Sequence, residues 1–97
     1  MTDHRTPVVL VHGAWHGGWC WDPFLPYLEA RGLAPHAPDL PGHGNNPLPM
    51  KDITLDRYAE AVVDVLDRLD EPAILVGHSM GGPTISEAAE RRPDKVK

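Results

Sequence analysis

Apolar residues gather along the chain in two kinds of pattern, short continuous runs and longer stretches with a helical period. Continuous apolar runs cover Pro7 to Val11 and Ala73 to Gly77, which is typical of strands buried on both faces of a sheet. A weaker run from Leu33 to Ala37 contains Pro35, which a strand tolerates only at an edge or at its start. The sequence therefore predicts three strands, of which the one that contains Pro35 has the weakest signal.

Three segments that follow these runs carry helix signals. Asp22 and Thr54 are good N-cap residues, Gly32 is a helix stop, and Pro72 and Pro93 each close a helix. The expected helices cover residues 23–31, 55–71 and 80–92. The second one has an apolar stripe at mostly three- and four-residue steps, made of Leu55, Tyr58, Ala59, Val62, Leu66 and Leu69.

The order strand, helix, strand, helix, strand, helix predicts an α/β fold. Its parallel strands would be joined by right-handed crossovers, with helices on the faces of the sheet. Residues 13–21 and 38–52 are rich in glycine or in proline, glycine and asparagine, so both are predicted loops. With 97 residues the chain has room for one domain at most.

Charge and cysteine content exclude several classes of protein. The net charge is −5, and the basic residues are scattered, so no nucleic-acid footprint is present. The apolar runs are far shorter than the roughly 18 residues of a membrane span, and residues 1–6 lack a secretory pattern, so we expect a cytoplasmic protein. Cys20 is the single cysteine, which excludes a disulfide within the chain and favours a small buried hydrophobe.

The sharpest local signal is the segment Gly77 to Gly82, which reads Gly-His-Ser-Met-Gly-Gly between the last apolar run and the third helix. It fits the Gly-x-Ser-x-Gly pattern of a nucleophile elbow, a strand-to-helix turn that exposes the serine hydroxyl. Large side chains two positions before or after the serine would collide in such a turn, and Gly77 and Gly81 avoid this. Ser79 is therefore the candidate nucleophile.

Two backbone N–H groups are candidates for binding an oxyanion beside Ser79. One belongs to Met80, which follows the serine at the start of the third helix. The other would come from the loop after another strand, where His12, Gly13 and Ala14 follow the first apolar run, and the Ala14 N–H is the best candidate. A pair of such donors would stabilise the tetrahedral intermediate of acyl transfer.

Other residues near these motifs admit structural as well as functional interpretations. Trp15, Trp19 and Trp21 could line a substrate pocket or belong to the core. Trp15 and His12 are the candidates for substrate contact. His12 and His16 have the spacing of a helical metal pair, but the glycines around them make a helix implausible, so no metal site is expected. No nucleotide-binding motif is present, and no cofactor is expected.

Three motifs together resemble the α/β-hydrolase superfamily. They are His12-Gly13, the segment Asp39 to Gly44 and the segment Gly77 to Gly82, each after a predicted strand and in the superfamily's order. The stretch from His12 to Trp21 looks like the branch of plant methyl esterases and hydroxynitrile lyases with bacterial relatives. The resemblance implies a partial α/β-hydrolase fold and a serine esterase acting on a small-molecule ester, with Ser79 as nucleophile and no metal or organic cofactor.

The resemblance also implies residues that this sequence lacks. In the superfamily an acid and then a histidine follow the serine, whereas all six histidines here precede Ser79. We therefore expect residues 1–97 to be the N-terminal portion of a single hydrolase domain, inactive alone, with an exposed edge at Ala73 to Gly77 where another chain could associate. Two alternatives are a non-catalytic fragment or partner-binding piece, and a lyase of the hydroxynitrile type.

Overall fold

The structure is a computed structural model that describes residues 4–44, 46 and 50–97. In this part of the chain a parallel sheet is formed by β1 (Thr6–Val11), β2 (Leu33–His36) and β3 (Ile74–Gly77), in the order β2-β1-β3. Thr6 pairs with Leu33 on one side of β1, and Val8 pairs with Ile74 on the other. The predicted α/β class is confirmed, and the strand that contains Pro35 lies at one edge of the sheet formed by the described residues.

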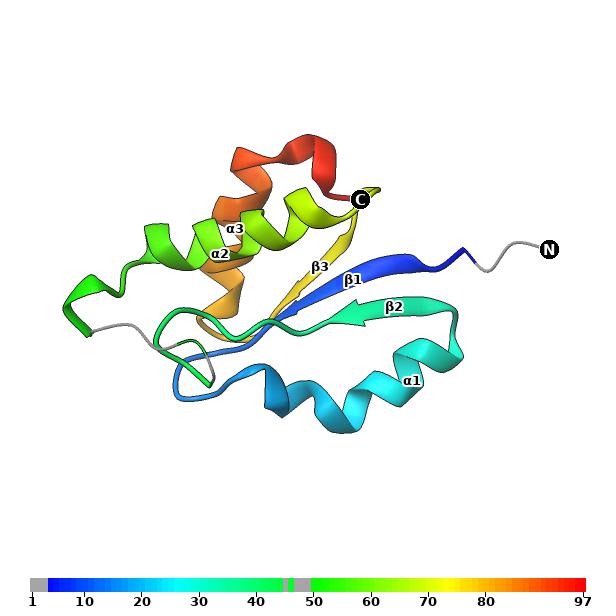
Figure 1. The fold of residues 1–97 in the computed structure, drawn as a ribbon, viewed down its shortest axis with the longest axis horizontal. Coiled ribbons are helices and arrows are strands. Elements are labelled where there is room, and N and C mark those ends of the chain that lie inside the picture. Colours follow the sequence, from blue (N-terminus) through cyan, green and yellow to red (C-terminus); the bar gives the residue numbers. More distant parts are fainter. Residues whose placement is uncertain (1–3, 45, 47–49) are drawn as a thin grey trace.

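Helices lie on both faces of this sheet (Figure 1). On one face α1 (Leu25–Ala30) packs against β2. On the other face α2 (Leu55–Arg68) and α3 (Gly81–Arg91) pack against each other and against the sheet. Short 3₁₀ helices cover Gly18–Phe24, Met50–Asp52 and Pro93–Lys95. None of the helices in the described ranges is long and apolar enough to cross a lipid bilayer.

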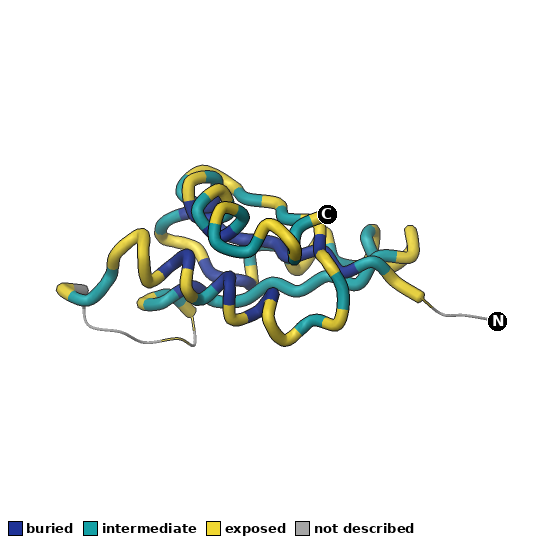
Figure 2. Tube along the Cα trace, turned by 90° about the horizontal axis from the view of Figure 1, so that it is seen from above, coloured by how far each residue is buried: buried dark blue, intermediate teal, exposed yellow. Residues whose placement is uncertain are grey.

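The main core lies between β1 and the pair formed by α2 and α3. Val9 and Val11 of β1 have no exposed surface, and they pack with other buried side chains: Leu40, Tyr58, Val62, Val63, Val65, Leu66, Ala73 and Ala88. Figure 2 shows buried positions through the middle of the molecule and exposed ones on the outer turns. Each large apolar side chain buried in this way contributes roughly 1.5–3 kcal/mol, so the stripe of α2 is the main attachment of that helix.

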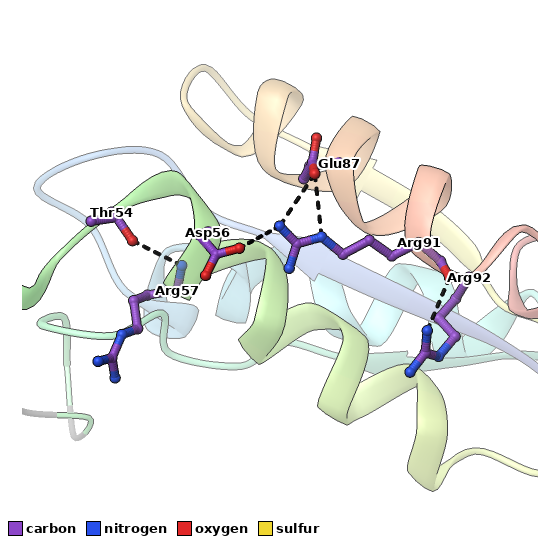
Figure 3. Close-up of polar contacts among 6 residues, drawn as sticks. All are labelled: Thr54, Asp56, Arg57, Glu87, Arg91 and Arg92. Atoms are coloured by element: carbon purple, nitrogen blue, oxygen red, sulfur yellow. Dashed lines mark hydrogen bonds and ion pairs between the residues drawn. The ribbon is translucent and has the colours of Figure 1, made fainter.

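The N-terminus of α2 is where the sequence predicts it. The Thr54 hydroxyl accepts a hydrogen bond from the Arg57 N–H at 3.1 Å. Asp56 in the first turn pairs with Arg91 of α3 at 2.6 Å, and Arg91 also contacts Glu87 at 3.2 Å (Figure 3). The two carboxylates are exposed and Arg91 is half-buried, so these ion pairs contribute little to stability and mainly complement the apolar contact between the two helices.

The beginning of the first helix is a correction to the sequence prediction. Residues 18–24 form a 3₁₀ helix, although the part up to Trp21 was expected to be loop, and α1 begins at Leu25 without a side-chain cap. Asp22 therefore lies inside the 3₁₀ helix and is not the N-cap. Pro23 and Pro26 offer no N–H, so this segment has fewer donors for α-helical bonds, and the tighter 3₁₀ turn forms first.

Two predictions about burial are also wrong. Ile74 and Val76 of β3 are 37% and 36% exposed and Leu75 is only half-buried, so this strand is not buried on both faces. Ile74 and Val76 remain exposed because α1, the helix on their face of the sheet, packs over β2 and does not extend over β3. On α2, Leu55 is 45% exposed and does not belong to the buried stripe, because it stands in the first turn, beyond the end of the core.

The outer edge of β3 is partly occupied. Ala73 pairs in parallel with Val96, because the Ala73 N–H donates to the Lys95 C=O at 2.9 Å and the Lys97 N–H donates to the Ala73 C=O at 2.8 Å. This pairing stops at Ala73. Among the described residues, none pairs with the outer edge of Ile74–Gly77.

Candidate functional site

The loops that follow β1 and β3 leave the sheet toward opposite faces. Val11 and Gly77, the last residues of the two strands, are paired neighbours. After them the chain runs toward α1 on one face and directly into α3 on the other (Figure 1). In open α/β sheets such a point, beyond the carboxyl ends of the strands, forms a crevice where ligands bind. Both candidate motifs, residues 12–14 and residues 77–82, lie at this point.

Ser79 occupies the strained centre of the turn after β3. Its φ angle is 55°, in the left-handed region that non-glycine residues enter only at a cost of order 1–3 kcal/mol. Its residue surface is exposed. The turn is closed by the Gly81 N–H, which donates to the His78 C=O at 2.8 Å, and by the Gly82 N–H, which donates to the Ser79 C=O at 2.9 Å. Ser79 is thus held at positive φ in a tight turn between β3 and α3.

The glycines on either side of Ser79 face backbone atoms that cannot move aside. A Cβ on Gly77 would lie 2.5 Å from the Gly81 C=O oxygen and 2.9 Å from the Gly82 nitrogen. A Cβ on Gly81 would collide with the Val11 C=O oxygen. The steric demand for glycine that the sequence pattern suggested is therefore present in the structure.

The loop after β1 lies against the serine. A Cβ on Gly13 would be 3.1 Å from the Ser79 Cβ and from the His78 C=O oxygen. The His78 N–H donates to the Val11 C=O at 3.0 Å, which fastens the two loops at their bases. Ala14 and Met80 are the chain neighbours of Gly13 and Ser79, which approach each other at this point. Within the described ranges neither of their N–H groups donates to another residue.

His12 lies beneath this loop with no exposed surface. Its Nε2 accepts the Leu40 N–H at 3.0 Å, and its Nδ1 lies 2.8 Å from the Gly13 C=O oxygen. Burial lowers the pKa of His12, and nearby His43 acts in the same direction, while the bond to Gly13 opposes the shift. A fully enclosed ring with both nitrogens bonded does not favour the substrate contact predicted for His12.

The loop after β2 folds around Asp39. The Asp39 Oδ1 accepts the Gly18 N–H at 2.7 Å, and the Asp39 C=O accepts the Asn46 side-chain amide at 3.1 Å. Gly44 has a φ of 52°, and a Cβ there would collide with the Asp39 carboxylate. The sequence analysis predicted this segment to be a loop and used it as one motif of the resemblance. It did not assign Asp39 the role of connecting the two loops, although an acid before a glycine-rich turn was a usable signal.

A cleft of about 430 Å³ opens beside the loop after β1, lined by Ala14, Trp15, His16, Trp19, Gly42, His43, Gly44, Ile53 and Tyr58. Ser79 is not among its lining residues. Trp15 and Trp19 are 89% and 60% exposed, so they form cleft walls and not core. Trp21 is half-buried, and its indole N–H is buried without a partner in the described part of the chain. Tyr58, which sequence reasoning assigned only to the helical stripe, also reaches the cleft.

The possible metal ligands and Cys20 add little to this site. Among residues 4–44, 46 and 50–97, no three His, Cys, Asp or Glu side chains are grouped so that they could hold a metal ion. His16 and His78 are edge to face with ring centroids 6.0 Å apart, and the His16 Nδ1 lies 2.9 Å from the Ala14 C=O oxygen. Cys20 is half-buried rather than fully buried, and burial raises the pKa of its thiol.

Comparison with known proteins gives concordant results. Residues 8–96 match the alpha/beta hydrolase family. The chain is 44% identical over 95 residues to a pyrethroid hydrolase of Sphingobium wenxiniae, covering 94% of this chain and 33% of that protein. It is 45% identical over 91 residues to putative methylesterase 14, chloroplastic, of Arabidopsis thaliana, covering 91% of this chain and 26% of that protein.

Solved structures agree with these sequence relatives. The crystal structure of polyneuridine aldehyde esterase matches with a TM-score of 0.87 and 36% identity, covering 96% of this chain and 38% of that one. The chain therefore spans about a quarter to a third of the length of the curated relatives described above. The similarity to plant methylesterases with bacterial relatives, which the sequence motifs indicated, is confirmed.

Proposed function

Because this chain belongs to the alpha/beta hydrolase family, we propose that it carries the nucleophile and the oxyanion donors of an enzyme that hydrolyses small carboxylic esters. The observation that carries the proposal is the elbow itself. An exposed Ser79 stands at a φ of 55° between two glycines that have no room for a side chain. The relatives named as a hydrolase and a methylesterase support the choice of an ester as substrate.

The proposed reaction begins at the Ser79 hydroxyl. Its Oγ attacks the acyl carbon, and the carbonyl oxygen becomes an oxyanion that the Ala14 and Met80 N–H groups bind. The bond to the alcohol oxygen then breaks, and the alcohol leaves with a proton. Water hydrolyses the acyl-serine to the free acid and restores the hydroxyl. Loss of one oxyanion donor typically lowers such rates about a hundredfold or more.

The cleft beside Ala14 suggests what the substrate carries. Trp15, Trp19 and Tyr58 give it aromatic walls, and Ile53 adds an aliphatic one. Pockets with such linings bind apolar groups, so an aromatic or branched acyl or alcohol part would fit there. Trp15 is proposed as a substrate contact on this ground, because its side chain is almost fully exposed at the cleft.

The proposed enzyme needs an acid and a base beyond these 97 residues. Residues 80–97 contain no histidine, and the relatives are about three to four times longer than the matched region. We propose that residues 1–97 are the N-terminal portion of one hydrolase domain whose acid and histidine belong to further sequence. Without that histidine a serine hydroxyl is a poor nucleophile at neutral pH, so this chain would retain only a small part of the activity.

A fluorophosphonate probe tests the nucleophile directly. At alkaline pH, where hydroxide can replace the missing base, we expect the folded chain to be labelled at Ser79, as read by mass spectrometry of its peptides. Ser79→Ala should remove the label. Ser86→Ala is the matched control, because Ser86 is the only other serine and its hydroxyl donates to the Gly82 C=O within α3. A folded chain that is never labelled, or is labelled equally at Ser86, contradicts the proposal.

A second candidate function rests on β3. Its outer edge beyond Ala73 has no paired strand in the described residues, and Ile74 and Val76 are partly exposed. Exposed strand edges with apolar faces pair readily with other chains, so a non-catalytic piece that binds a strand-supplying partner is the alternative. Folded but unlabelled protein favours this alternative, and release of cyanide and aldehyde from a cyanohydrin without ester turnover would favour a hydroxynitrile-type lyase.

A further inference from the structure

The buried imidazole of His12 exists in one tautomer. Its Nε2 lies 3.0 Å from the Leu40 backbone nitrogen, which can only donate, so Nε2 must be the unprotonated acceptor. The proton then sits on Nδ1, which donates to the Gly13 C=O oxygen at 2.8 Å. Both ring nitrogens are thus used inside the protein, and the ring has no exposed surface on which to meet a substrate.

On its Nε2 side, the His12 ring is hydrogen-bonded to the buried core. Leu40 is itself fully buried in the main core, and its C=O accepts the His43 N–H at 2.9 Å. The bond from the Leu40 N–H to His12 therefore joins the ring to the buried core. His12 in turn fixes the position of the Gly13 C=O oxygen, which also accepts the His16 N–H at 3.3 Å.

The Gly13 C=O and the Ala14 N–H belong to the same peptide group. In a trans peptide these two groups point in opposite directions across one plane. Holding the Gly13 oxygen toward the buried ring therefore turns the Ala14 N–H away from it. No acceptor within the described ranges binds that N–H, and Gly13 is close enough to Ser79 for the direction to matter.

We propose that His12 is a positioning residue, which orients the Ala14 N–H for an oxyanion by holding the Gly13 C=O. This inference rests on the proposed function, because the oxyanion role of Ala14 belongs to that proposal. The bond that orients the Ala14 N–H is the one from the His12 Nδ1–H to the Gly13 C=O. The bond from Leu40 to Nε2 serves to hold the ring in place.

Two isosteric substitutions separate these bonds. In His12→Asn the side-chain amide stands near the former Nδ1 and can still donate to the Gly13 C=O. In His12→Gln the amide reaches the former Nε2 and can still accept from the Leu40 N–H, while the bond to Gly13 is lost. Nuclear magnetic resonance of the 97-residue chain, labelled with ¹⁵N and ¹³C, reads the His12 tautomer, the Gly13 carbonyl shift and the Ala14 amide.

We expect the Nδ1–H tautomer in the unmodified chain, and a Gly13 carbonyl and Ala14 amide that keep their shifts in His12→Asn but move in His12→Gln. At Ser79, fluorophosphonate labelling should be about a hundredfold slower in His12→Gln than in His12→Asn, the size of one lost oxyanion donor. An Nε2–H tautomer overturns the proposal, and so do identical Ala14 shifts in both variants.

The resonance measurements also keep this inference apart from the proposed function. If Ser79 is never labelled in the unmodified chain but the tautomer and the shifts behave as expected, the esterase proposal fails and the orienting role of His12 for the Gly13–Ala14 peptide stands. If both variants fail to fold, the unmodified chain still tests the inference, because an Nε2–H tautomer could not donate to the Gly13 C=O and would overturn it.

Discussion

At the residue scale, the site depends on one strained residue and on the backbone that keeps it strained. Ser79 at a φ of 55° would relax if its neighbours allowed it. They do not, because His78 is bonded on both sides, through its N–H to Val11 and through its C=O to the Gly81 N–H. Strain persists only where the surrounding structure over-determines it, and such positions cluster at functional sites.

Alanine substitution of three nearby glycines tests this packing. Gly77→Ala would place a Cβ 2.5 Å from a backbone oxygen, so we expect a loss of about 3 kcal/mol in the free energy of unfolding. Gly81→Ala should be similarly costly, because its Cβ meets the Val11 C=O. Gly82→Ala is the matched control, since a Cβ there meets nothing within 4 Å, and helix propensity favours alanine by up to about 1 kcal/mol. Urea unfolding curves measure all three.

That panel has a clear negative result. If Gly77→Ala and Gly82→Ala unfold at the same urea concentration with the same slope, the close approach of β3 and α3 is not a constraint on the protein. The steric explanation of the Gly-x-Ser-x-Gly spacing in this chain would then be wrong.

At the element scale, the two edges of the sheet differ in how they resist pairing with other chains. β2 forms one edge, and its Pro35 lacks the N–H that a neighbouring strand would bond. β3 forms the other edge, where Val96 pairs with Ala73 and no described residue pairs further along. Proline in β2 was visible in the sequence. The open stretch of β3 was expected only from the resemblance, because it depends on which strand becomes its neighbour and no pattern within β3 shows that.

The cap of α2 gives an element-scale prediction. Thr54→Ala removes the acceptor for the Arg57 N–H, so we expect the free energy of unfolding to fall by about 1 kcal/mol. Thr54→Ser keeps a hydroxyl acceptor and should stay within a few tenths of the unmodified chain. Both values come from urea unfolding monitored by circular dichroism at 222 nm. Equal losses in the two variants would show that the methyl group, not the hydrogen bond, is what counts.

At the scale of the whole molecule, His12 connects the loops after β1 and β2 and thereby couples the fold to pH. Burial lowers the pKa of His12 in the folded chain, while the unfolded chain keeps a value near 6.5. Between these two values the unfolded state binds more protons, so the folded state loses stability as the pH falls. Above about pH 6.5 both states are neutral and this contribution is fully present.

We therefore predict that the free energy of unfolding decreases as the pH is lowered from 6.5, with a His12 contribution of at most about 1.4 kcal/mol per pH unit. Thermal and urea unfolding between pH 5 and pH 7.5 measure the slope. His12→Gln removes the titrating group and keeps the bond to Leu40, so its slope should be smaller over the same range. An identical slope in that variant would mean that other groups cause the acid sensitivity.

The sequence by itself determined the local features of this protein. The alternation of strands and helices, the Thr54 cap and the tight turn from Gly77 to Gly82 all depend on residues close together in the chain. Their physical basis is short-range, because steric limits on φ and ψ, missing N–H groups and caps act over a few residues. The first helix was misplaced because two prolines compete at its start.

Only the tertiary structure decided which distant residues come into contact with these local features. The strand order β2-β1-β3 places Gly13 against Ser79, joins His12 to Leu40 and gathers Trp15 and Tyr58 around one cleft. It also leaves Ile74 and Val76 exposed on a strand whose sequence is as apolar as that of β1. Such contacts join residues tens of positions apart, so they follow from the way strands and helices pack together and not from any pattern within one segment.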